Sequence, residues 1–181
     1  LSGLKFYRRV HTEDTTALEF AERAEPLFSL WRQTGVWNLC HPWMEVSLPW
    51  ESAAPYVEGV LRSLPPMLVT GGLVTLQPRP ATASRLPLLR EPDGRYVMGF
   101  GILPAVSRQF LPMALPMLRK ASDLGIEIGG KRVLSGWVEF DHAQWKAHFG
   151  EVWSKLLEWK QFYDPKGVLN PGIIQYSESA G

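Results

Sequence analysis

Hydrophobic and polar residues alternate in several short stretches of the chain, as they do in half-buried strands. In residues 42–48 the alternation puts Met44 and Val46 on one side and Trp43 and Glu45 on the other. The further strands predicted from alternation or from Val and aromatic content are residues 67–77, 96–103 and 131–140. Pro49 is expected to end the first of these strands.

Apolar residues at helical spacing predict helices between these strands. The predicted helices are residues 12–31, 52–64, 107–124, 142–149 and 152–162. Pro26 is expected to kink or divide the first helix, and Thr12 or Asp14 is expected to be its N-cap. Gly35 is a natural stop for the first helix and Gly125 for the third.

Helices and strands interleaved in this order predict an α+β fold, an antiparallel β-sheet with helices packed on one face. No repeat or linker divides the sequence, so residues 1–181 are expected to form a single domain. The Pro-rich segment 78–92 is the expected mobile loop.

Composition narrows the classes of protein and partner. The formal net charge of the 181 residues is +1 and the basic residues are scattered, so nucleic acid is not an expected partner. No apolar run approaches the roughly 20 residues that span a bilayer, and a soluble chain is expected. The single cysteine, Cys40, allows no intrachain disulfide and leaves the compartment open. Because the chain begins at Leu1 without a Met or a signal peptide, it is interpreted as a fragment or a processed product.

Common catalytic signatures are absent from the sequence, including the nucleophile elbow, the phosphate loop and the zinc motifs. His142 and His148 are six residues apart and lie on different sides of a helix, so no metal site is expected. Cys40 stands next to His41, and an imidazole can activate a thiol as a nucleophile. Because neighbours in an extended chain point to opposite faces, Cys40 is interpreted instead as a buried structural thiol. Gly99 and Gly101 are interpreted as backbone clearance and not as part of a dinucleotide fingerprint.

An indole and a carboxylate recur together on two predicted strands. Trp43 and Glu45 share one side of the first strand, and Ser135, Trp137 and Glu139 share one side of the last. Such a pair of faces can hold a small planar, nitrogen-bearing ligand by stacking and hydrogen bonding. The alternative is that both rings belong to the core and both carboxylates to the solvated surface.

Three segments, taken in order, resemble the cytokinin dehydrogenases, which are flavoenzymes of the vanillyl-alcohol-oxidase superfamily. They are His41-Pro42-Trp43 before the first strand, Trp-Lys-Ala-His-Phe-Gly at residues 145–150, and Tyr-Asp-Pro-Lys-Gly-Val-Leu-Asn-Pro-Gly at residues 163–172. The last pattern is shared by many FAD-linked oxidases, whereas the first two together are narrower. The loose similarity covers about residues 4–176, the part that corresponds to the C-terminal, FAD and cytokinin (substrate) binding domain of that family.

This resemblance implies a ferredoxin-like cap domain that covers the flavin and shapes the substrate pocket. FAD would be held mainly by an FAD-binding domain that is expected upstream and absent from this chain, so the chain alone is expected to be inactive. The residue implied in substrate binding is Trp43. Glu45 stands where the plant enzymes carry Asn, and it is added with Leu134 and Trp137 from the places of these residues on the predicted strands. The residues implied in cofactor binding are His41, Asn170, Pro171 and Gly172.

The function implied is that of the substrate-binding domain of an FAD-dependent oxidoreductase, which oxidises a small amine or alcohol by hydride transfer to flavin. No catalytic residue is expected on this chain. Two alternatives remain: a non-catalytic α+β module that binds a small molecule or dimerises, and the cap domain of an aldonolactone or sugar-alcohol oxidase. The sequence leaves the oligomeric state open.

Overall fold

The computed structural model describes residues 14–68, 72–81 and 86–177. By contacts between residues the chain divides into two compact units, 1–38 and 39–181. Within the described residues, no helix is long and apolar enough to cross a membrane.

The first unit consists of short helices, α1 (Ala17–Glu22), α2 (Glu25–Thr34) and the 3-10 turn η1 (Val36–Asn38). The predicted first helix is divided, as expected, with Pro26 in the first turn of α2. Gly35 ends α2 in the left-handed region at φ 79°. The N-cap is Thr16 and not Asp14, because the Thr16 hydroxyl accepts the Glu19 amide in a capping box. Thr12 lies outside the described residues.

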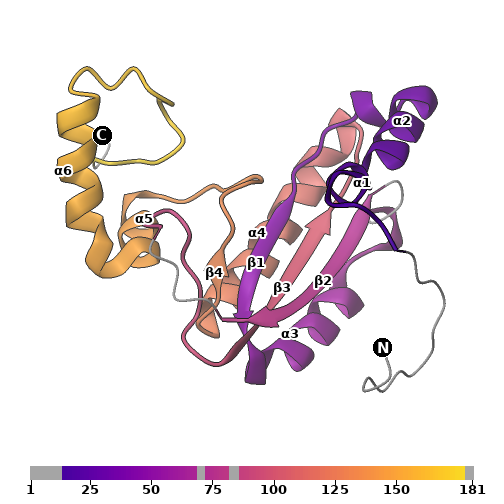
Figure 1. Ribbon diagram of the computed structural model, residues 1–181, viewed down its shortest axis with the longest axis horizontal. Coiled ribbons are helices and arrows are strands. Elements are labelled where there is room, and N and C mark those ends of the chain that lie inside the picture. The colour runs from indigo at the N-terminus through magenta and orange to yellow at the C-terminus, as the bar shows by residue number, and fades with distance from the viewer. Residues whose placement is uncertain (1–13, 69–71, 82–85, 178–181) are drawn as a thin grey trace. The chain divides into compact units, whose positions relative to one another are not determined.

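The second unit contains a four-stranded antiparallel sheet in the order β2-β3-β1-β4 (Figure 1). Its strands are β1 (Met44–Pro49), β2 (Leu73–Pro80), β3 (Tyr96–Leu103) and β4 (Lys131–Arg132). The edge position of β2 accommodates Pro78 and Pro80, which lack an amide donor. Of the strand predicted at 67–77, the described part becomes extended only at Leu73, and residues 69–71 lie outside the described residues.

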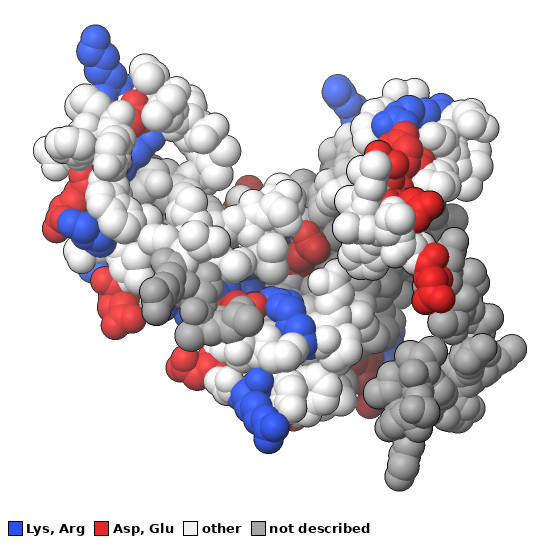
Figure 2. All heavy atoms as spheres, viewed as in Figure 1, with Lys and Arg blue, Asp and Glu red and all other residues white. Residues whose placement is uncertain are grey.

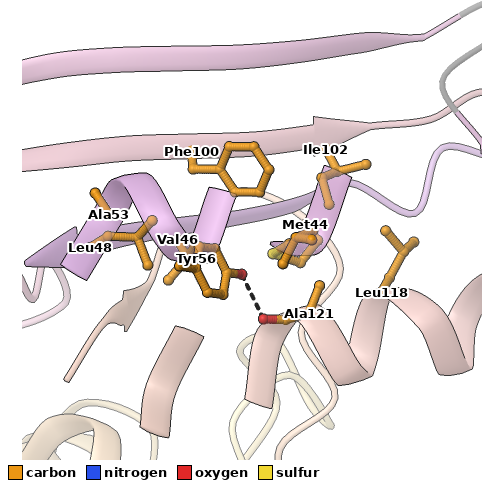
Figure 3. Close-up of a cluster of buried hydrophobic side chains, with 10 residues drawn as sticks. Met44, Val46, Leu48, Ala53, Tyr56, Phe100, Ile102, Leu118 and Ala121 are labelled. Carbon is orange, nitrogen blue, oxygen red and sulfur yellow. Dashed lines mark hydrogen bonds between the residues drawn. The ribbon is translucent and has the colours of Figure 1, made fainter. Parts of the chain in front are cut away.

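Helices α3 (Trp50–Ser63) and α4 (Leu111–Glu127) cover one face of the sheet. Apolar side chains from β1, β3 and both helices form the buried cluster drawn in Figure 3. Met44, Val46 and Leu48 are fully buried there, which confirms the apolar side predicted for the first strand. The Tyr56 hydroxyl donates to the Ala121 carbonyl at 2.6 Å and ties α3 to α4. The α+β fold expected from the sequence is therefore confirmed.

Gly125 does not end the third predicted helix, because α4 continues to Glu127. A Cβ at Gly125 would lie 3.2 Å from Val46 Cγ2 and 3.2 Å from the Tyr56 hydroxyl. The missing side chain therefore lets α4 approach β1 and α3 closely, and packing explains this glycine better than capping does.

The strand predicted over 131–140 is much shorter than expected, since only Lys131 and Arg132 pair with β1. Beyond them the chain runs without regular structure along the start of β1, and the Trp137 amide donates to the Trp43 carbonyl at 2.8 Å. The predicted shared face is not formed. The Ser135 hydroxyl bonds the Glu45 carboxylate, whereas Trp137 packs against the cluster on the helix side of the sheet.

A second buried cluster joins the C-terminal helices α5 (His142–Phe149) and α6 (Trp153–Tyr163). Asp141 caps α5 through the Gln144 amide. The aromatic rings stack in sequence at interplanar angles of 12–15°; they are Trp145, Phe149, Trp153 and Tyr176. The remaining 3-10 turns are η2 (Pro66–Leu68), η3 (Arg108–Phe110) and η4 (Gly150–Val152).

Candidate functional site

The face of the sheet opposite α3 and α4, here called the polar face, carries Glu45, Ser47, Thr75, Gln77 and Arg79. These residues occupy matching register positions on β1 and β2, on either side of β3. Four of them line a hollow of about 310 Å³; they are Glu45, Thr75, Gln77 and Arg79. One face of the sheet thus builds the core while the other offers hydrogen-bonding groups.

Gly99 and Gly101 of β3 make room for these polar side chains. A Cβ at Gly101 would lie 2.5 Å from the Thr75 hydroxyl and 3.3 Å from Glu45 Cγ. At Gly99 it would lie 3.0 Å from Arg79 Nη1. The interpretation of both glycines as clearance is confirmed, and what they clear is space for the side chains of the polar face.

An ion pair closes one side of the hollow. Arg79 bonds Glu91 through Nε at 3.1 Å and through Nη2, which also donates to the Ser47 hydroxyl at 3.0 Å. The Glu91 side chain is only 6% exposed. Glu91 comes from the Pro-rich segment 78–92, so part of the expected mobile loop contributes to the wall of the site. Its mobility stays a prediction.

His41 and Trp43 lie just before β1, and both side chains are half-buried. Their rings meet edge to face, with centroids 5.9 Å apart. A Cβ at Gly136 would lie 2.3 Å from the Trp43 carbonyl oxygen, so only glycine fits at this crossing. At this crossing the backbones of Trp43 and Trp137 lie side by side. Glu45, two residues after Trp43, lines the hollow of the polar face.

Arg132 fixes this arrangement from the helix side. Its guanidinium is buried and donates to the Glu45 carbonyl at 2.9 Å, the Trp137 carbonyl at 2.8 Å and the Ser122 hydroxyl at 2.7 Å. Burial lowers the pKa of Arg132 to about 10, so the group stays charged at neutral pH. One side chain therefore links β1, α4 and the segment that carries Trp137.

Leu134 and Asn170 both line a second, mostly apolar pocket with a volume of about 510 Å³. Its walls come from α6, from residues 169–176 and from the Pro-rich segment through Pro87 and Leu88. That segment therefore borders both the apolar pocket and the polar hollow. The structure thus brings a predicted substrate residue and a predicted cofactor residue together, apart from the Glu45 hollow.

Asp164 shapes the loop that carries Asn170. Its buried carboxylate accepts the Val168 amide at 2.8 Å and the Leu169 amide at 2.9 Å, and it pairs with Lys160. The Lys160 contact, followed by these amides, lowers the pKa of the Asp164 carboxyl.

The backbone of this loop is open to close approach at Pro171 and Gly172. Asn170 and Gly172 adopt left-handed backbone conformations at φ 47° and 83°. Pro171 and Gly172 are exposed, and a Cβ at Gly172 would meet no atom within 4 Å, so a planar group could approach this backbone closely.

The described residues contain no cluster of three or more His, Cys, Asp or Glu side chains placed to hold a metal ion. The face shown in Figure 2 carries Lys and Arg interspersed with Asp and Glu.

The comparisons with known proteins agree with the resemblance drawn from the motifs. Residues 124–175 match the family described as "Cytokinin dehydrogenase 1, FAD and cytokinin binding". The chain is 27% identical over 169 residues to cytokinin dehydrogenase 6 of Oryza sativa subsp. japonica, covering 90% of this chain and 31% of that protein. It is also 27% identical over 180 residues to cytokinin dehydrogenase 2 of Arabidopsis thaliana, covering 95% and 35%.

The chain therefore spans about a third of the length of these curated relatives. The description of the matching family names FAD, the cofactor expected from the sequence. The chain is thus similar to the cytokinin dehydrogenases over most of its length, and its residues 124–175 match the family model of their FAD and cytokinin binding domain.

Proposed function

We propose that this chain is the substrate-binding domain of an FAD-dependent oxidoreductase that oxidises a small amine or alcohol by hydride transfer to flavin. The observation that supports it best is the two-sided sheet, with a core on one face and the Glu45 hollow on the other. Bound FAD would accept the hydride, while the residues of this chain orient the substrate and exclude water.

In this proposal the FAD-binding domain lies upstream in the same protein, and residues 1–181 act as one substrate-binding domain. The loop of Asn170, Pro171 and Gly172, together with His41, would cover the flavin. Trp43 and Glu45 would contact the substrate, and Leu134 would line the adjacent apolar pocket. Trp137, whose ring packs on the helix side, would act through its backbone contact with Trp43.

The full-length protein tests the proposal directly. Purified without added cofactor, it should show the absorption bands of bound flavin, and a small aromatic amine or alcohol should bleach them under anaerobic conditions. A full-length protein that neither retains nor binds flavin would remove the proposal.

Replacing Trp43 with alanine in the full-length protein should raise KM and lower kcat while FAD stays bound. Stacking on an aromatic ring is worth about 0.5–1.5 kcal/mol beyond the area it buries, so kcat/KM should fall about tenfold or more. Steady-state kinetics and the flavin spectrum measure the two effects. Trp43→Phe is the matched control, because it keeps an aromatic face, and unchanged kinetics in Trp43→Ala would leave the indole a packing role only.

A further inference from the structure

We infer that the polar face selects a substrate with a positively charged nitrogen and that Glu45 is the residue that sets this preference. This inference rests on the proposed function, since it names the substrate class of the same site. Its starting point is the balance of charge around the hollow, which Glu45, Arg79 and Glu91 line.

The positive charge of Arg79 is already neutralised inside the hollow. Its Nε and Nη2 atoms bond the Glu91 carboxylate, and Nη2 also donates to Ser47. Because the Glu91 side chain is almost fully buried, this pair is held in a medium where opposite charges attract strongly. An anionic substrate would have to compete with Glu91 for the guanidinium.

Among the described residues, no ion pair holds the Glu45 carboxylate on the polar face, although the buried Arg132 attracts it from beneath. The Glu45 carboxylate accepts one hydrogen bond on that face, from the Ser135 hydroxyl at 2.6 Å, and Ser135 is exposed. Arg132 lies beneath it on the helix side, but its three hydrogen bonds go to two backbone carbonyls and Ser122. Ionised carboxylates accept several hydrogen bonds, so Glu45 retains capacity for a cationic group.

The shape of the hollow supports the same conclusion. Gly101 lies opposite Glu45, where a larger residue would press on the Glu45 side chain. The other lining groups include Thr75 and Gln77, which are polar and uncharged. A cationic nitrogen placed here would meet the Glu45 carboxylate, while Arg79, the cation among the described lining residues, is paired with Glu91.

The test uses three small probes that share a benzyl or phenyl group and differ in charge: benzyltrimethylammonium, benzyl alcohol and benzoate. Dissociation constants for the full-length protein are measured by NMR titration, which needs neither turnover nor flavin. The wild-type protein should bind the ammonium probe more tightly than the other two. In Glu45→Gln its dissociation constant should rise about tenfold, as expected for a charge pair near the surface, while benzyl alcohol changes less than twofold.

Glu139→Gln is the matched control, because it removes the same charge from an exposed carboxylate that pairs with Arg119 outside the hollow. It should leave all three constants unchanged. Raising the salt concentration should shrink the Glu45 effect. Equal weakening of charged and neutral probes in Glu45→Gln, or no change in either, would overturn the inference.

The two failures can be told apart. A full-length protein without flavin that still prefers the cation through Glu45 would refute the proposed oxidoreductase and keep the inference. A flavin-bound, active protein whose probe affinities do not change in Glu45→Gln would refute the inference and keep the proposed oxidoreductase.

Discussion

Replacing Arg132 with alanine is expected to lower the free energy of unfolding by about 3 kcal/mol, because three acceptors in the interior each lose a hydrogen bond and, among the described residues, only the Glu45 carbonyl keeps another donor, the Val133 amide. The acceptors are the Glu45 carbonyl, the Trp137 carbonyl and the Ser122 hydroxyl. A buried polar group left unpaired costs about 1–3 kcal/mol, and the energy spent on burying the guanidinium offsets only part of this sum. Urea unfolding of the 181-residue chain, followed by circular dichroism, measures the change.

The matched control is Arg119→Ala on α4. Arg119 is about half-exposed and pairs with Glu139, so its removal should cost less than about 1 kcal/mol. Arg132→Lys keeps the charge but cannot donate in three fixed directions, and it should fall between the wild type and Arg132→Ala. If Arg132→Ala were as stable as Arg119→Ala, the guanidinium would not be what joins β1 to the Trp137 segment.

The role of Arg132 also explains where the sequence misleads. Alternation correctly predicts the apolar side of β1 because that side packs on the helices, whereas β3 is predicted from its Val and aromatic content. The segment after Arg132 alternates too, yet Gly136 crosses against the Trp43 carbonyl and Trp137 turns to the helix side. The periodic pattern does not show that, beyond residue 132, pairing with β1 gives way to the hydrogen bonds of Arg132 and the close crossing at Gly136.

The candidate site was predictable only in part for a similar reason. Trp43 and Glu45 are neighbours on one strand, so local periodicity is enough to place them together. Arg79 and Glu91 are twelve residues apart across a Pro-rich connection, and Ser135 reaches Glu45 from ninety residues away. Glu91 and Ser135 lie outside the strands, so these long-range contacts depend on how the connecting segments pack against the sheet. In the sequence, Gly99 and Gly101 indicate that space is needed beside β3, but they do not identify the side chains that fill it.

The two pockets divide the predicted residues in a way that bears on the proposed function. Glu45 belongs to the polar hollow, while Leu134 and Asn170 belong to the apolar pocket. The segment 86–91 touches both, with Leu88 in one and Leu89 in the other. A substrate with a charged end and an apolar body would suit two such neighbouring environments, each supplied by different elements of the same unit.

Lowering the pH from about 6.5 to about 4 is expected to remove about 3 kcal/mol of stability through His148 alone. Burial, followed by the nearby charges of Lys131, Arg132 and Arg90, lowers the pKa of His148 to about 4. Its ordinary value is 6.5, so the unfolded chain takes up a proton first as the pH falls. The neutral imidazole therefore contributes full stability above pH 6.5. Each unit of difference between the unfolded and folded pKa is worth about 1.4 kcal/mol. The stability that His148 contributes is therefore lost as the pH falls from 6.5 to the folded pKa of about 4.

The structural cause is the position of His148 among Phe140, Trp145 and Phe149, where the residue is 6% exposed. Its Nε2 atom has no hydrogen-bond partner among the described residues, so no hydrogen bond at this atom stabilises the protonated imidazole. Asp123 and Glu127 line the same hollow as His148.

His148→Gln isolates the effect, because glutamine is polar and does not titrate. Urea unfolding at several pH values should give wild-type and His148→Gln curves that run parallel above pH 7. Below that they should converge, since only the wild type loses the histidine contribution. Carboxylates with lowered pKa, such as Asp164, titrate in both proteins and cancel in the difference. Curves that stay parallel down to pH 4 would contradict the prediction, because they would mean that His148 takes up its proton equally readily in the folded and unfolded protein.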